Sequence, residues 1–298
     1  MKCLSDATNR EKQEVVDTLR RTPDFKLSEL LTYVSLTRST YYYLKSHPKN
    51  TIRDDKLAAL IKEIKAPKFQ EEYGYRRVTG ELHDNGYQVN HKRVLSIMRQ
   101  YNLLSKKYNT RRRRYNSYRG TVGRIADRLI KRDFAADKPY QKIVTDITEI
   151  KYNGQQKAYV TAYVDLYSSE VLSFNVTKTP SLALVVDPLL ELSNIDNAII
   201  HSDQGFHYQK PVFLRALDRL NLRQSMSRKA TPLDNAPIES FFHILKVNVV
   251  YDKNYESFDK FRSEINDFIY YYNNRRRKEK LHGLSPVKYR QLAMEIAN

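Results

Sequence analysis

The sequence predicts an α/β (α+β) chain in which a mixed five-stranded sheet with flanking helices follows a helical front region. Between residues 142 and 177, three runs rich in Val, Ile, Thr, Tyr and Phe are spaced like hairpin-linked strands. From residue 181 onward, helical and strand patterns alternate, and the chain ends in three helical segments. Before residue 142, apolar residues recur mainly at helical spacing. These three observations predict the fold class.

The charge of the chain is unevenly distributed. Its 298 residues include 52 Lys or Arg and 34 Asp or Glu, a formal net charge of +18. Residues 1–137 hold 30 basic and 16 acidic side chains, a balance of +14, whereas residues 138–298 hold 22 and 18, a balance of +4. A charge this large indicates a polyanionic partner. Residues 1–137 are therefore predicted to bind DNA, and residues 138–298 resemble an ordinary globular core.

Several classes of protein are excluded by what the sequence lacks. Cys3 is the only cysteine, so there is no disulfide framework and no cysteine-based zinc site. We expect no membrane association, because no apolar run approaches the roughly 20 residues of a membrane span and the N-terminus lacks a signal-peptide core. No glycine falls in a nucleotide-binding motif. The expected location is the cytoplasm.

The first predicted region covers residues 1–66. Three short helical patterns lie within residues 11–46, and Thr37 or Ser39 is placed to cap the last of them. Two short helices joined by a tight turn favour a helix-turn-helix, with any small helical bundle as the alternative. A further helix is predicted over residues 51–66, where Pro67 follows its end.

A second helix-turn-helix-like region is predicted over residues 67–118. Its first helix covers residues 75–85, Asn85-Gly86 marks the turn, and Asn90 caps a second helix over residues 91–101. The apolar face of that second helix leaves three basic side chains for solvent or phosphate. They are Lys92, Arg93 and Arg99.

The chain carries no acidic residue for 42 positions between Asp84 and Asp127, yet it carries 11 Lys or Arg there. Tyrosines flank the densest basic run, which supports nucleic-acid binding over the alternative of a solvated linker. That run comprises Arg111, Arg112, Arg113 and Arg114. Residues 119–137 are predicted to be a basic linker.

The remaining residues, 138–298, are predicted to form one core. Three antiparallel strands are expected over residues 143–152, 157–165 and 171–177, with Asn153-Gly154 as the first turn. Helix, strand, helix and strand are then expected over residues 181–192, 198–201, 211–220 and 222–225. Helices over residues 236–250, 257–273 and 286–296 complete the core. This is the element order of an RNase H-like fold.

Three carboxylates stand out in this core. Asp146 lies in a β-branched run, Asp203 ends an apolar strand before a glycine-containing turn, and Glu239 lies in the first turn of an amphipathic helix. An unpaired buried carboxylate is costly, and a metal ion would compensate it. Three carboxylates together can hold two divalent ions that act on a phosphodiester. The alternatives are an edge-strand aspartate facing water and an exposed glutamate on a solvated helix.

The helix at residues 236–250 adds a cation to this set. Asn235 or Asp234 is placed to cap it, and Glu239, His243 and Lys246 fall at i, i+4 and i+7 along one face. A carboxylate at one end of this face suits a metal ion, and Lys246 at the other end suits a DNA phosphate. His201, which shares a strand face with Asp203, is interpreted as a packed neighbour.

With these motifs, the chain resembles the OrfB-type transposases of insertion sequences with two overlapping reading frames, which are relatives of retroviral integrase. Residues 73–118 resemble the helix-turn-helix region of that family. Residues 139–290 resemble its integrase core, including the segments HSDQG, LDNAPIESFFHILK and YYYNNRRRKEKLHGLSP. The resemblance implies a DDE site in which Asp146, Asp203 and Glu239 hold two Mg²⁺ ions. It also implies that Lys246 contacts transposon-end DNA.

The resemblance implies partners as well as residues. Transposon ends and target DNA are the expected substrates, and a homo-oligomer is expected on DNA. Mn²⁺ is expected to substitute for Mg²⁺, because both ions prefer hard oxygen ligands.

Two departures from the family pattern qualify the resemblance. Ile143 stands where a Trp usually precedes the first aspartate, and the chain has no Trp. No sustained heptad pattern occurs near Met1, so a partner or fusion from an upstream reading frame is expected. The alternatives to a transposase are an RNase H-like nuclease without strand transfer and a DNA-binding regulator.

Overall fold

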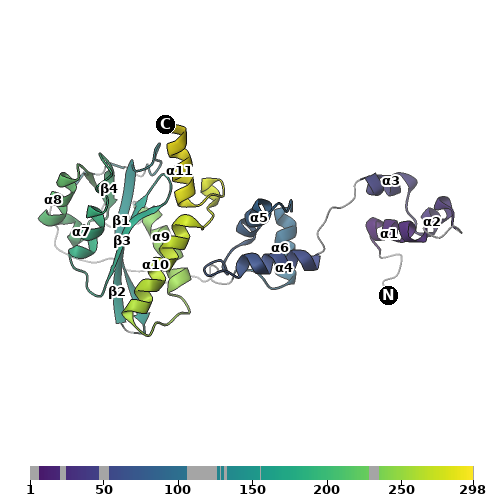
Figure 1. The fold of residues 1–298 in the computed structure, drawn as a ribbon, viewed down its shortest axis with the longest axis horizontal. Helices are drawn as coiled ribbons and strands as arrows, with labels where there is room; N and C mark the ends of the chain where they lie inside the picture. Colours follow the sequence, from purple (N-terminus) through teal and green to yellow (C-terminus); the bar gives the residue numbers. More distant parts are fainter. Residues whose placement is uncertain are drawn as a thin grey trace. The chain divides into compact units, whose positions relative to one another are not determined.

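The computed structural model describes residues 7–20, 25–46, 54–105, 126–127, 129–130, 133–154, 156–227 and 235–297. The chain falls into two compact units, Met1–Leu57 and Ala58–Asn298, whose elements are shown in Figure 1. The predicted DNA-binding run Arg111–Arg114 lies outside the described residues. The predicted domain boundaries near residues 66, 118 and 137 remain predictions.

The first unit contains three short helices around a small apolar core. They are α1 (Asn9–Leu19), α2 (Leu27–Tyr33) and α3 (Arg38–Ser46). Between α2 and α3 the chain turns tightly through Ser35, whose φ of 52° is left-handed. Thr37 caps α3, since its Oγ1 accepts the N–H of Thr40 at 3.2 Å. The buried residues that hold the three helices together are Val16, Leu30, Leu31, Val34, Leu36 and Tyr41.

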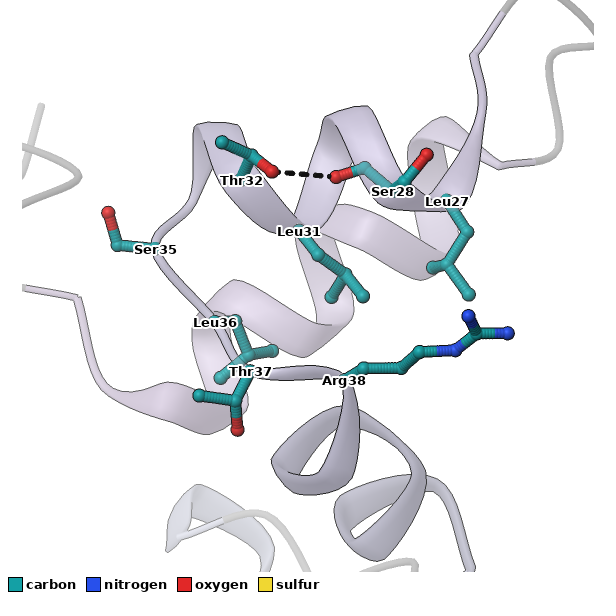
Figure 2. A pocket seen from close by; sticks show the side chains of 8 residues that line it. All are labelled: Leu27, Ser28, Leu31, Thr32, Ser35, Leu36, Thr37 and Arg38. Carbon is teal, nitrogen blue, oxygen red and sulfur yellow. Dashed lines mark hydrogen bonds between the residues drawn. The ribbon is translucent and has the colours of Figure 1, made fainter.

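A hollow of about 590 Å³ lies along this turn. Figure 2 shows its lining, in which Thr32 Oγ1 donates to the carbonyl of Ser28 at 2.9 Å. The hollow is lined by Leu27, Ser28, Leu31, Thr32, Ser35, Leu36, Thr37 and Arg38. It belongs to the first unit, whereas the three predicted carboxylates belong to the second.

The second unit begins with a helical module, which we define as residues 58–105. It contains most of α4 (Asp54–Lys65), followed by α5 (Tyr75–Asp84) and α6 (His91–Gln100). The predicted turn is confirmed, because Gly86 has a φ of 82° that favours glycine. The predicted cap is also confirmed, because the side chain of Asn90 accepts the N–H of Lys92 at 2.8 Å. The two helices contact each other, and their buried side chains include Val78, Leu82, Val94, Ile97 and Met98.

A mixed five-stranded sheet follows, as the sequence predicts. Its strands are β1 (Lys142–Asn153), β2 (Gln156–Asp165), β3 (Val171–Thr177), β4 (Ile199–Ser202) and β5 (Arg223–Met226). Their order across the sheet is β3-β2-β1-β4-β5. The β1–β2 and β2–β3 pairs are antiparallel, whereas the β1–β4 and β4–β5 pairs are parallel. The predicted turn between β1 and β2 is confirmed by Gly154, whose φ is 56°.

Helices cover both faces of the sheet (Figure 1). One face carries α7 (Ala183–Leu190) and α8 (Pro211–Arg219), and the other carries α9 (Ala236–Val249) and α10 (Phe258–Asn274). The last helix is α11 (Pro286–Ala297). Ile143 is fully buried in the core beneath α7 and α8, so it fills an interior position. Within the described ranges, no helix is both long enough and apolar enough to span a bilayer.

The helix predicted over residues 181–192 is shorter in the structure. Residues 181–183 make a tight i→i+3 turn, in which the N–H of Leu184 donates to the carbonyl of Ser181 at 3.1 Å. The regular helix therefore begins at Ala183.

Asp165, at the end of β2, anchors the turn that leads to β3. It is fully buried and accepts the N–H of Tyr140 at 3.0 Å and the N–H of Ser168 at 2.8 Å. The hydroxyl of Ser168 also donates to it, at 2.7 Å. Burial raises the pKa of Asp165, whereas these donors oppose the shift. One carboxylate thus satisfies three donors at the end of β2, two of which, the N–H and the hydroxyl of Ser168, are buried.

We expect Asp165→Ala to lower the free energy of unfolding by about 3 kcal/mol, because it leaves the buried N–H and hydroxyl of Ser168 and the N–H of Tyr140 without their acceptor. Urea unfolding followed by circular dichroism measures this loss. Asp187→Ala, which removes an exposed carboxylate of α7, is the matched control. Equal stability of the two variants would contradict the anchoring role.

Candidate active site

Strand pairing brings the two predicted aspartates to the same place in the sheet. β1 and β4 are parallel neighbours, and Val144 pairs with His201. Asp146 lies two residues beyond this pair on β1, and Asp203 directly follows Ser202, the last residue of β4. The paired strands therefore lead both aspartates toward the same end of the β1–β4 pair. The charge of Asp203 acts on Asp146, so the two carboxylates lie near each other.

Glu239 and Lys246 come to this place from a different element. Both lie on α9, which packs against β1. The apolar side of α9 faces the core, since Ile238, Phe241, Phe242, Leu245 and Val249 are all buried. This packing leaves Glu239 exposed in the first turn and Lys246 half-buried two turns later.

Electrostatics connect all four charged groups. The pKa of Asp146 is raised well above its ordinary value, first by burial and then by the negative charge of Asp203. The charge of Glu239 also raises it, whereas the positive charge of Lys246 lowers it. Burial likewise raises the pKa of Asp203, although the N–H of Gly205 and the His207 ring oppose this shift. Asp203, Glu239 and Lys246 thus all lie within electrostatic reach of Asp146.

The carboxylates share this region without forming a closed cage. In the part of the chain that the structure describes, no three Asp, Glu, His or Cys side chains converge closely enough to hold a metal ion. The donor chemistry nevertheless suits a hard cation, because the candidate ligands are all carboxylate oxygens. Two neighbouring carboxylates with raised pKa values are also a place where a cation would relieve repulsion. The donor chemistry of the two aspartates therefore fits Mg²⁺.

The turn after Asp203 holds that carboxylate in one orientation. The N–H of Gly205 donates to Asp203 Oδ1 at 2.8 Å. A Cβ on Gly205 would lie 2.8 Å from the same oxygen, which is closer than real Cβ contacts. Gly205 has an ordinary φ of −59°, so space rather than backbone conformation requires glycine here. Gly205 was not predicted as a site residue, although its position two residues after Asp203 was a usable signal.

Three glutamine side chains fix the same turn. Gln204 Nε2 donates to the carbonyl of Ser227 at 3.0 Å, and Gln209 Nε2 donates to the carbonyl of Gln204 at 2.6 Å. Gln224 Nε2, from β5, donates to the carbonyl of Tyr208 at 2.7 Å. Hydrogen bonds therefore connect the turn after Asp203 to β5 and to the residue that follows β5, and one hydrogen bond lies within the turn.

Asp146 has its own support. Its Oδ1 accepts the N–H of Ile147 at 2.8 Å, and its carbonyl accepts the hydroxyl of Thr161, from β2, at 3.0 Å. Beneath the two aspartates, the almost fully buried Tyr208 has its hydroxyl 3.3 Å from the hydroxyl of Thr145. Burial raises the pKa of Tyr208, and so do the charges of nearby Tyr163 and both aspartates. Tyr208 was not predicted, because only tertiary packing brings it there.

The interpretation of His201 as a packed neighbour is confirmed. The residue is 1% exposed, and its Nδ1 lies 2.9 Å from the hydroxyl of Ser225.

The predicted cap of α9 is wrong for Asn235. Asn235 lies at the N-cap position, but its side chain makes no capping hydrogen bond. Both polar atoms of its amide are buried without a hydrogen-bond partner. Asp234, the other candidate, lies outside the described residues.

The predicted DNA contacts of the helical module lie on α6. Lys92 and Arg99 are exposed there, and Arg93 is half-buried. Their contact with DNA remains a prediction.

Comparisons with known proteins match this architecture. Residues 136–232 and 239–294 each match the model of the integrase core domain. Residues 53–114 match the model of an HTH-like domain. The two core matches contain the three predicted carboxylates, and the HTH-like match covers the helical module.

Two transposases resemble the chain across most of its length. It is 38% identical over 272 residues to the putative transposase InsK for insertion sequence element IS150 of Escherichia coli (strain K12), covering 89% of this chain and 94% of that protein. It is 36% identical over 295 residues to the probable transposase for insertion sequence element IS1353 of Shigella flexneri, covering 96% of this chain and 55% of that protein.

Among solved structures, the HTLV-2 integrase catalytic core domain in complex with magnesium matches with 16% identity and a TM-score of 0.42, covering 52% of this chain and 99% of that one. That likeness is too weak to add to the assignment, which rests on the sequence relatives. The chain belongs to the insertion-sequence transposases, polynucleotidyl transferases with an integrase core domain.

Proposed function

We propose that this chain carries out Mg²⁺-dependent DNA strand cleavage and strand transfer for an insertion sequence, with Asp146, Asp203 and Glu239 as its DDE site. The observation that carries the proposal is the pairing of β1 with β4, which leads the two aspartates toward the same end of this strand pair. The shared electrostatics with Glu239 and Lys246 support it. Membership in the transposase family supports the reaction type.

Each residue has a distinct part in this proposal. Asp146 and Asp203 would hold the metal from the sheet, and the exposed carboxylate of Glu239 would turn toward them from α9. Two Mg²⁺ ions, when bound, would stabilise negative charge on the attacking and leaving oxygens of the phosphodiester. Lys246, two turns along α9, would pair with a DNA phosphate near the site. Gly205 would keep the Asp203 carboxylate oriented.

Contacts away from the site would supply affinity for DNA. We propose that Lys92, Arg93 and Arg99 on α6 contact phosphates, together with Arg111–Arg114. The helix pair α2–α3 of the first unit is proposed as a further DNA-binding element, since α3 carries the exposed side chains of Tyr42 and Tyr43.

Joining requires two transposon ends in one complex. We therefore also propose that the chain works on DNA as a homo-oligomer, in the cytoplasm, and together with or fused to the product of an upstream reading frame.

We expect Asp146→Asn, Asp203→Asn and Glu239→Gln each to lower cleavage and joining by on the order of a thousandfold, because each removes one ligand charge with little change in volume. The measurement uses a labelled transposon end and separates cleaved from joined products. Gel-shift affinity should stay unchanged, and Asp187→Asn on α7 should behave as wild type.

The same assay separates the proposal from its competitors. Cleavage by the wild-type protein without joined products would identify a nuclease. DNA binding without either reaction would identify a regulator. Near wild-type joining by any of the three variants would remove that residue from the site.

Mg²⁺ should stabilise the folded protein, because a cation relieves the repulsion between the two aspartates. We expect Mg²⁺ or Mn²⁺ to raise the melting temperature of the wild-type protein by several degrees at pH 7.5, roughly 1–2 kcal/mol. Without metal, Asp146→Asn should melt higher than wild type, since it removes one of the two repelling charges. Addition of Mg²⁺ should raise the melting temperature of this variant by less than it raises that of the wild-type protein. An equal gain in both proteins, measured by calorimetry, would contradict metal binding at Asp146.

Gly205→Ala should impair catalysis more than folding. The added Cβ has to displace the Asp203 carboxylate, whereas the backbone conformation suits alanine. We expect cleavage to fall by roughly a hundredfold, as for other small misplacements of reacting groups, with a nearly unchanged melting temperature. Gly74→Ala, where a Cβ meets nothing within 4 Å, is the matched control. Wild-type cleavage by Gly205→Ala would show that Asp203 tolerates the shift.

A further inference from the structure

The basic run after α10 does not behave as its sequence suggests. Residues 275–280, RRRKEK, look like a DNA-binding patch. In the structure, Arg276 is 2% exposed and the side chain of Arg277 is 19% exposed. Lys278 donates to the hydroxyl of Tyr272 at 2.9 Å, and burial together with the charges of Arg276 and Arg77 lowers its pKa to about 7. The centre of the run therefore faces protein.

The protein that Arg277 faces is the helical module. Its guanidinium forms an ion pair with Asp84 at the end of α5 and lies against two glycines. A Cβ on Gly80, in α5, would lie 2.8 Å from Arg277 Nε, and a Cβ on Gly283 would lie 2.8 Å from Arg277 Nη2. In return, Arg77 Nε donates to the carbonyl of Arg277 at 3.0 Å. Arg277 thus occupies a fitted slot between α5 and the segment after α10.

Ion pairs extend this contact on both sides of the slot. Arg76 pairs with Glu279 at 2.6 Å. Lys68 pairs with Glu264 at 2.6 Å and with Asp267 at 2.8 Å, both on α10.

An aromatic contact lies beside the ion pairs of Lys68. The ring of Phe69, 4% exposed, lies 5.3 Å from the ring of Phe268 and 5.4 Å from that of Tyr271. Exposed ion pairs contribute little by themselves, so the buried aromatic contact and the Arg277 slot define the geometry. These contacts join segments about 200 residues apart in the sequence.

We propose that this contact is a positioning device that holds the helical module at a fixed distance from the catalytic carboxylates and so sets which phosphodiester bond is cut. This inference rests on the proposed function. Domains joined by small polar interfaces move relative to one another by default. A shift of about 3.4 Å along DNA equals one nucleotide. A helical module that moved by this distance relative to the carboxylates would therefore lead to cleavage at several neighbouring phosphodiester bonds. Arg277 is the central positioning residue.

The first experiment measures the docking without any activity. In full-length Cys3→Ser protein, spin labels are attached at Gln100→Cys on α6 and Glu295→Cys on α11. In the otherwise wild-type protein, we expect a narrow distribution of distances between the two labels. This distribution should broaden severalfold in Arg277→Ala, in Asp84→Arg and in Arg277→Asp. It should become narrow again when Asp84→Arg and Arg277→Asp are combined in one protein. Arg262→Ala, an exposed arginine of α10, should leave the distribution narrow. An unchanged distribution in Arg277→Ala would overturn the docking role.

The second experiment maps cut positions on a labelled transposon end at single-nucleotide resolution. We expect wild type and Arg262→Ala to cut one main bond. Arg277→Ala and Gly80→Leu should bind the end with unchanged affinity, lose roughly tenfold to a hundredfold in cutting at that bond, and cut neighbouring bonds. The combined Asp84→Arg and Arg277→Asp protein should recover the main cut.

Gly80→Ala tests the slot separately, because alanine favours the helix. This variant should retain a stable fold and still cut neighbouring bonds in addition to the main one. Cutting at the same bond and rate by Arg277→Ala would overturn the inference, whereas absence of any cut by wild type would instead contradict the proposed function.

Discussion

The parallel pairing of β1 with β4 is the constraint on which the rest of the site depends. It is short, covering three residue pairs from Lys142–Ile199 to Val144–His201. Beyond it β4 ends, whereas β1 continues against β2. Asp146 and Asp203 therefore meet where one strand stops and its neighbour runs on. A slip of one residue in this pairing would send one aspartate to the opposite face of the sheet. The buried positions around it, including Ile143 and Ile200, hold the register.

The same pairing creates electrostatic repulsion in the folded protein. Two aspartates with raised pKa values lie together, with Glu239 close enough to add to the repulsion. Such an arrangement opposes folding and is tolerated where it serves a reaction. The surrounding structure offsets it through the backbone N–H groups of Ile147 and Gly205 and through the charge of Lys246. The site thus lowers the stability of the folded protein locally, and the well-packed core compensates for this.

Periodicity made the elements predictable, and tertiary geometry made the details unpredictable. The β-branched strands and the amphipathic helix α9 follow from local patterns, and so does the buried place of His201. Tyr208 could not be predicted, because only tertiary packing brings its hydroxyl from the turn after Asp203 to Thr145 on β1. The expected cap by Asn235 failed, because the residue lies at the N-cap but its buried amide makes no capping hydrogen bond. The contacts of Arg277 could not be predicted either, since a basic run in the sequence looks the same whether it faces DNA or protein.

The slot around Arg277 also bears on how such chains can be recombined. Gly80 and Asp84 lie in the helical module, whereas Arg277 and Gly283 lie in the catalytic core. A chimaera that takes its recognition helices from one transposase and its core from another inherits only half of this set. Grafting therefore has to move the four positions together, even though they lie in two blocks about 200 residues apart. A swap that respects only the linear boundary between the modules separates residues that fit one another.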